Sequence, residues 1–193
     1  MGRADRVAAA ARRSPSSPRA VVYFAKVQTV YERIFVELNK AGARYVVVGG
    51  VAVVLHGYAR FTADLDLVID LTSTEARNVI ATLVRMGFGP GVPVDPLSFA
   101  ESTVRERWIA EKNMRVFSML DSRNPMHVID LFVSPPIPFE ELWSAASEVD
   151  LPGARVKIAS IDHLIEMKKI AGRPQDMIDI EKLAEIAGRR AKP

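Results

Sequence analysis

Residues 44–70 read RYVVVGGVAVVLHGYARFTADLDLVID and carry the pattern that decides the fold. The β-branched run over 44–50 predicts a buried strand that ends in two glycines. Residues 51–57 are long enough for one or two helical turns. From Asp64 onward the run 61–70 alternates polar and apolar residues, and this two-residue period predicts a strand with one apolar face and an acidic start.

The rest of the chain alternates between helical and strand-like patterns, with no internal repeat. Helices are expected over 24–42, 72–86, a stretch that opens at Asp95–Pro96, 139–149, 160–170 and 174–187. Strands are expected over 114–120 and 126–133, which form a hairpin, and over 154–159. Thr72 and Glu75 have the spacing of a capping box. The glycines and prolines of residues 88–95 predict a loop.

The charge of the chain is unevenly distributed. The 193 residues carry a net charge of +3, but residues 1–20 contribute +4 and residues 189–193 another +3, so −4 remains for residues 21–188. We therefore expect a disordered basic arm (1–20), one domain (21–188) and a basic tail (189–193). A mildly acidic body argues against an extensive nucleic-acid-binding face and is compatible with a carboxylate-lined metal site.

Within the domain, we expect the sheet over about 44–133 and a helical part over about 138–188. The basic arm also has the composition of a targeting segment, which stays open as an alternative.

Composition excludes several classes of protein. The chain has no cysteine, so it has no disulfide scaffold, no thiol nucleophile and no cysteine-ligated zinc site. It contains no apolar run of about 18 residues, which excludes a membrane-spanning helix. The lack of cysteine suits a cytosolic protein, and we expect a cytoplasmic location.

Three aspartates are candidates for catalysis. Asp64 and Asp66 lie two residues apart on one strand, so their side chains point the same way. Asp130 interrupts an apolar strand, where an ionised group is costly unless it is paired or bound to a metal. Phosphoryl transfer uses Mg²⁺ ions held by carboxylates from neighbouring strands. The alternative is a solvated strand start for the Asp-x-Asp pair.

Gly49 and Gly50 lie where a strand passes into a helix. Glycines at this point offer backbone amides to a phosphate, which the helix N-terminus also favours. The pattern is neither Gly-x-Gly-x-x-Gly nor followed by a P-loop lysine, so dinucleotide-binding and P-loop folds are excluded.

Together these motifs resemble the nucleotidyltransferase superfamily, which has the polymerase-β-like fold. The finer pattern of Gly-Gly-x-Ala, His-Gly-x-x-Arg-x-Thr and Asp-Leu-Asp-Leu resembles the AbiEii-type branch, which includes toxins of toxin–antitoxin pairs. Lys168 and the Arg-x-x-Asp-x-x-Asp run over 173–179 are similar to its C-terminal pattern. The resemblance covers roughly 44–70, 126–133 and 160–183. It implies an α/β (α+β) fold with a mixed β-sheet flanked by helices and a helical C-terminal segment.

The resemblance also implies roles for individual residues. Asp64 and Asp66 would ligate Mg²⁺, with Mn²⁺ as the alternative. Asp130 would bind the catalytic metal and help to deprotonate the acceptor hydroxyl.

The nucleotide would be bound by a second set of residues. Gly49 and Gly50 would approach the triphosphate, while Arg60 and Thr62 would contact phosphate or position the loop. Lys168 would neutralise phosphate charge, or would be a plain surface lysine. Asp176 and Asp179 are expected to pair with Arg173 and to fix the packing of the C-terminal helices.

The implied activity is Mg²⁺-dependent transfer of an NMP unit from an NTP to an acceptor hydroxyl. The acceptor would be a tRNA 3′ end or a protein side chain, and the chain would be a toxin with a cognate antitoxin. Two alternatives remain: a non-catalytic member of the fold that binds a nucleotide or a partner, and a small-molecule nucleotidyltransferase.

Overall fold

The computed structural model describes residues 31–190. The basic arm, the first part of the helix expected over 24–42 and the last three residues lie outside the described residues. Seven strands form one sheet in the order β3-β4-β5-β2-β1-β7-β6. Their bounds are Tyr45–Val47 (β1), Asp64–Ile69 (β2), Phe88–Pro90 (β3), Val116–Asp121 (β4), Asn124–Phe132 (β5), Ser147–Leu151 (β6) and Ala154–Ile158 (β7).

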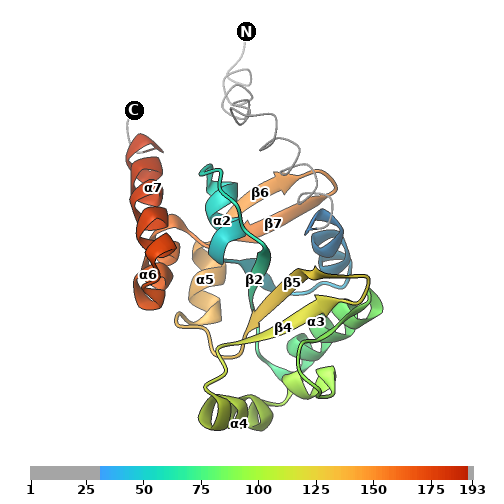
Figure 1. The fold of residues 1–193 in the computed structure, drawn as a ribbon. Helices are drawn as coiled ribbons and strands as arrows, with labels where there is room; N and C mark the ends of the chain where they lie inside the picture. Colours follow the sequence, from blue (N-terminus) through green and yellow to red (C-terminus); the bar gives the residue numbers. More distant parts are fainter. Residues whose placement is uncertain (1–30, 191–193) are drawn as a thin grey trace.

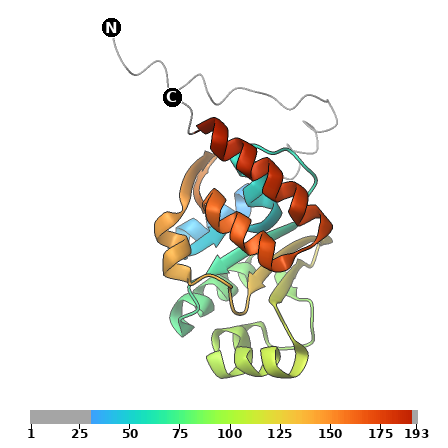
Figure 2. The same cartoon turned by 90° about the vertical axis from the view of Figure 1, so that its left-hand side faces the viewer.

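Helices cover both faces of this sheet. They are residues 31–40, α2 (Gly49–His56), α3 (Ser73–Arg85), the 3₁₀ helix η1 (Pro96–Ala100), α4 (Ser102–Lys112), α5 (Phe139–Ala145), α6 (Ile161–Ala171) and α7 (Pro174–Arg190). Figure 1 shows α2, α6 and α7 on one side of the sheet, with helix 31–40 and α3 on the other. Figure 2 looks onto α6 and α7, which cross in front of the strands. The expected mixed sheet flanked by helices, with a helical C-terminal segment, is confirmed.

The centre of the sheet combines parallel and antiparallel pairs. Strand β2 pairs antiparallel with β1 and parallel with β5. The apolar face of β2 is fully buried, since Leu65 and Leu67 have no exposed area. Burial of side chains of this size stabilises the fold by about 1.5–3 kcal/mol each, and it fixes which face of β2 the intervening aspartates occupy.

The two glycines after β1 belong to the helix and do not end the strand. Strand β1 stops at Val47, and α2 begins at Gly49. Gly49 has a φ of 60°, a conformation that L side chains rarely adopt. This residue turns the chain directly from strand into helix, so the strand predicted over 44–50 is too long.

The two edge strands of the sheet, β3 and β6, were not predicted from the sequence. Residues 88–90, predicted as loop, form β3 and pair antiparallel with β4. Pro90 is compatible with this strand because an edge strand has one side without partners. Residues 147–151 form β6 and pair with β7, although residues 147–149 were predicted as the end of a helix. Their alternation of charged and apolar residues has the two-residue period of a strand.

Two helix ends also differ from expectation. Helix α3 begins after Thr72 as predicted, but the Thr72 side chain makes no capping hydrogen bond. Its backbone N–H donates to Asp70 Oδ1 at 3.0 Å. Helix α7 extends beyond residue 187 to Arg190, whose guanidinium donates to the His56 carbonyl at 3.1 Å. This contact makes part of the expected basic tail a portion of the folded domain.

Three further expectations are confirmed, with small shifts in bounds. The hairpin expected over 114–120 and 126–133 is formed by residues 116–121 and 124–132, residues 154–158 form β7, and Ser160 caps α6 by accepting a hydrogen bond from the His163 N–H. None of the helices between residues 31 and 190 has the length and apolar character needed to cross a membrane.

Candidate active site

The candidate site is built on the parallel pair β2 and β5. In this pair Asp66 lies directly opposite Asp130, and Asp64 lies opposite Val128. Residues in register on neighbouring strands have their side chains on the same face of a sheet. The structure therefore brings Asp66 and Asp130 together from positions 64 residues apart in the sequence.

Strand β4 adds a residue that the sequence analysis missed. Ser118 lies opposite Asp130 in the β4–β5 register, and its hydroxyl donates to Asp130 Oδ1 at 2.6 Å. The hydrogen bond fixes the orientation of this carboxylate. The hairpin was predicted, but its register depends on the length of the turn, which local patterning did not determine.

Both glycines at the start of α2 are required by close approach. A Cβ atom at Gly49 would overlap the Asp66 carboxylate, and one at Gly50 would overlap the Thr62 hydroxyl and lie 2.8 Å from Arg60 Nη2. The Gly50 N–H also donates to the Asp66 carboxylate. The helix N-terminus, Asp66, Arg60 and Thr62 thus lie in one cluster, and their binding of a nucleotide stays a prediction.

Two carboxyl groups of the site, Asp66 and Asp130, have raised pKa values. Burial raises the pKa of Asp66 to about 6, and the charges of Asp130 and Asp64 add to this effect. Burial also raises the pKa of Asp130, against the hydrogen bond from Ser118. A positive ligand would relieve the repulsion among the three carboxylates.

A cavity of about 660 Å³ lies over these residues. Asp66, Asp130 and Gly49 line it from the sheet and from α2, whereas Asp64 is not among its lining residues. An apolar wall faces them, made of Phe132, Pro135, Pro136, Leu164, Met167, Ile170 and Ala171. Three cations also line the cavity: Arg115, Lys168 and Arg173.

Two of these cations belong to a buried charge network. Lys168 Nζ contacts Asp179 Oδ2 at 2.6 Å and Asp176 Oδ1 at 3.0 Å. Arg60 also pairs with Asp179, at 2.9 Å, and Arg173 with Asp176, at 2.9 Å. Asp179 is fully buried, which makes it the centre of the network.

The network corrects part of the sequence interpretation. Asp176 pairs with Arg173 as expected, but Asp179 pairs with Lys168 and Arg60. Lys168 is buried, so it is not a plain surface lysine. Three cations against two carboxylates leave one surplus positive charge beside Asp66.

The donor set is suited to a hard divalent cation. Asp64, Asp66 and Asp130 supply only carboxylate oxygens, the ligands that Mg²⁺ prefers. Their mutual repulsion fits the same conclusion. Among residues 31–190, no group of three or more His, Cys, Asp or Glu side chains converges closely enough to hold a metal ion. The types of side chain therefore suit Mg²⁺, and Asp66 and Asp130 are the two that lie next to each other.

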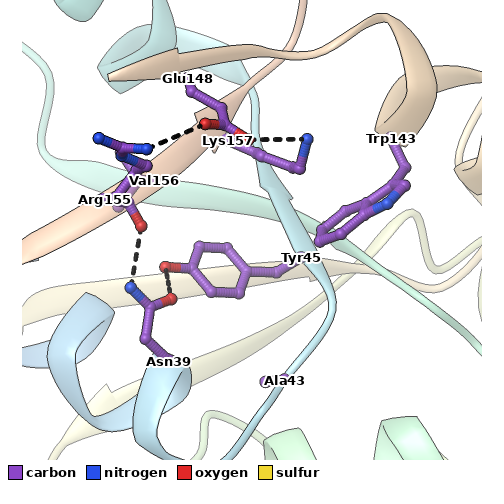
Figure 3. Close-up of a pocket in the computed structure, with 8 residues that line it drawn as sticks. All are labelled: Asn39, Ala43, Tyr45, Trp143, Glu148, Arg155, Val156 and Lys157. Carbon is purple, nitrogen blue, oxygen red and sulfur yellow. Dashed lines mark hydrogen bonds and ion pairs between the residues drawn. The ribbon is translucent and has the colours of Figure 1, made fainter. Parts of the chain in front are cut away.

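A smaller cavity, of about 180 Å³, lies between helix 31–40, α5 and the β6–β7 edge (Figure 3). Lys157 Nζ lies 4.8 Å from the centroid of the Trp143 ring and pairs with Glu148. Tyr45 donates its hydroxyl hydrogen to Asn39 at 2.8 Å. None of the predicted site residues lines this cavity.

Comparison with known proteins identifies the fold. No family model and no curated protein matches the sequence. The solved structure of the lincosamide antibiotic adenylyltransferase LnuA, bound to lincomycin, is similar with a TM-score of 0.51 and 15% identity. That alignment covers 90% of this chain and 99% of LnuA.

Two further solved structures have the same fold. ANT(2″)-Ia in complex with adenylyl-2″-tobramycin aligns with a TM-score of 0.54 and 13% identity, over 86% of this chain and 99% of that chain. An antigenic nucleotidyltransferase-like protein from Paracoccidioides brasiliensis aligns with a TM-score of 0.52 and 18% identity, over 82% and 74%. The chain thus has the nucleotidyltransferase fold that the motifs predicted. The AbiEii-type branch stays a prediction.

Replacement of Gly49 should disturb the site directly. We expect Gly49→Ala to lower the free energy of unfolding by about 1–3 kcal/mol, because the new methyl group meets the Asp66 carboxylate at a strained φ. Gly188→Ala is the matched control, since that position in α7 has open space and alanine favours helix. Urea unfolding measures both variants. Equal stability of Gly49→Ala and the wild type would contradict the close approach.

The raised pKa of Asp66 predicts a pH-dependent stability. This carboxyl titrates near 3.8 when unfolded and near 6 when folded, so the free energy of unfolding falls as the pH rises from about 4 to 6. We expect Asp66→Asn to be more stable than the wild type by about 1–3 kcal/mol at pH 7, with the difference disappearing near pH 4. Urea unfolding at several pH values tests this, and a variant less stable at pH 7 would refute it.

Loss of the central carboxylate of the network should destabilise the fold. Asp179→Asn leaves Arg60 without its buried partner and Lys168 with Asp176 alone, and we expect a loss of about 3–5 kcal/mol in the free energy of unfolding. Glu185→Gln removes the exposed Lys182–Glu185 pair on the same helix and should leave stability nearly unchanged. Chemical denaturation measures the free energy of unfolding of both variants. Equal values for the two variants would show that the network does not stabilise the fold.

Proposed function

We propose that the chain is a Mg²⁺-dependent nucleotidyltransferase that moves an NMP unit from an NTP to an acceptor hydroxyl. The observation that carries the proposal is the in-register pair of Asp66 and Asp130 beside the N-terminus of α2, within one cavity. The shared fold with adenylyltransferases supports it.

The nucleotide end of the site is the N-terminus of α2. The backbone amide of Gly49 and the helix dipole favour the triphosphate there, while the Gly50 N–H donates to the Asp66 carboxylate. The surplus positive charge of the Arg60–Asp179–Lys168–Asp176–Arg173 network lies close by and favours the same group. In this proposal Arg60 positions the loop before β2 and does not bind phosphate, because its charge is already neutralised by Asp179.

Asp130 is the residue that receives the acceptor proton. Ser118 holds its Oδ1, which leaves Oδ2 for the incoming hydroxyl. The acceptor oxygen forms a bond to the α-phosphorus, the bond to the bridging oxygen breaks, and pyrophosphate leaves with the electron pair. Mg²⁺ bound by Asp64, Asp66 and Asp130 would neutralise charge on the phosphate oxygens.

Two classes of acceptor are supported by different observations. One similar structure is named as a lincosamide antibiotic adenylyltransferase, and another is bound to adenylyl-2″-tobramycin. These two structures support a small molecule as the acceptor. The motif resemblance supports a tRNA 3′ end or a protein side chain, and with it a toxin that has a cognate antitoxin.

Transfer of label from the four α-³²P-labelled NTPs tests the proposal. The reactions contain Mg²⁺ and either total tRNA, a protein extract or a panel of small alcohols. We expect label on one acceptor class, a decrease of about 10²- to 10⁴-fold in Asp130→Asn, and loss of transfer in Asp66→Ala and in EDTA.

The control is Asp150→Asn, which changes an exposed carboxylate on the edge strand β6 and should retain activity. Binding of NTP without transfer to any acceptor would refute the enzyme and favour the non-catalytic alternative.

A further inference from the structure

We infer that the acceptor is a small alcohol that also carries a carboxylate or a phosphate, and that Arg115 binds this anionic group. The inference rests on the proposed function and specifies the substrate class of the same cavity.

Arg115 is the unpaired cation of the cavity. It directly precedes β4, where its carbonyl accepts a hydrogen bond from the Val133 N–H at 3.2 Å. Its side chain is exposed and lines the cavity. Lys168 and Arg173 are both paired with Asp176, whereas the Arg115 guanidinium has no hydrogen-bond or ion-pair partner within residues 31–190. A cation in this state is available to a ligand.

The strand order separates Arg115 from the triphosphate. The α2 N-terminus lies over β2, because a Cβ atom at Gly49 would overlap the Asp66 carboxylate, and the order β2-β5-β4 places β4 two strand spacings away. At about 4.8 Å per spacing, this separation is about 10 Å. Asp130 lies on β5, the strand between. Arg115 is therefore next to the strand of Asp130, the residue that receives the acceptor proton, and on the far side of that strand from the glycines.

The neighbours of Arg115 in the cavity fit a small ligand. The ring of Phe132 and the rings of Pro135 and Pro136 supply apolar surface, and the Ser134 hydroxyl supplies a further polar group. Arginine binds carboxylate and phosphate through two parallel hydrogen bonds. Residues 21–190, which include the two arginines that end α7, carry a net charge of −2, so the body of the protein does not attract a long polyanion, whereas Arg115 attracts a single anionic group locally.

Matched acceptor pairs test the inference. Pyrophosphate release from each NTP with Mg²⁺ is measured with glycerol 3-phosphate against glycerol, with glycerate against glycerol, with CMP against cytidine, and with total tRNA. We expect the charged member of at least one pair to have the higher kcat/KM. In Arg115→Gln the ratio between the two members should fall by about 10- to 100-fold.

Two variants serve as comparisons. Arg173→Gln, at the nucleotide end, should lower kcat/KM for both members alike and keep their ratio. Arg107→Gln, on the exposed face of α4, should change neither value.

The outcomes separate this inference from the proposed function. Absence of turnover with every acceptor contradicts the proposed function, and the inference is then decided by calorimetric binding of the same pairs to the protein loaded with α,β-methylene-ATP and Mg²⁺. Equal behaviour of charged and neutral members in both measurements overturns the inference, as does an unchanged ratio in Arg115→Gln. Transfer to tRNA alone overturns the assignment of a small acceptor.

Discussion

The parallel pairing of β2 with β5 is the constraint on which the site depends. It places Asp66 opposite Asp130, and the antiparallel hairpin then places Ser118 opposite Asp130. A shift of one residue in either register would move an aspartate to the buried face, where Leu65 and Leu67 now pack. Burial of the apolar face of β2 therefore fixes the register that holds the carboxylates next to each other.

The grouping of the carboxylates also affects their ionisation. Burial, and then the charges of Asp130 and Asp64, raise the pKa of Asp66. The free energy of unfolding therefore falls when Asp66 loses its proton. The charge network centred on Asp179 joins α6 and α7 to Arg60. The same network therefore links the loop before β2 to the packing of the C-terminal helices.

Local pattern is sufficient where a feature depends on residues close in sequence. The motifs over 44–70 predicted the strand–helix turn and the Asp-x-Asp strand in this way, whereas the fold was predicted from the resemblance that these motifs carry together with residues 126–133 and 160–183. Patterning missed β3 and β6, since both are short edge strands whose pairing partners determine them. It also missed the role of Ser118, which depends on the register of a hairpin. Lys168 and Arg60 were identified as charged site residues, but their shared partner Asp179 was not.

The sequence by itself determined the alternation that sets Asp64 and Asp66 on one face, the glycines that open α2, and the break in apolar character at Asp130. These are local properties, governed by backbone conformation and by the period of side chains along a strand. Only the tertiary structure decided that Asp130 lies beside Asp66, that Asp179 pairs with both Lys168 and Arg60, and that Arg115 lines the cavity without an ion-pair partner among residues 31–190. These arrangements depend on strand order and helix packing, which bring together residues that no local pattern relates.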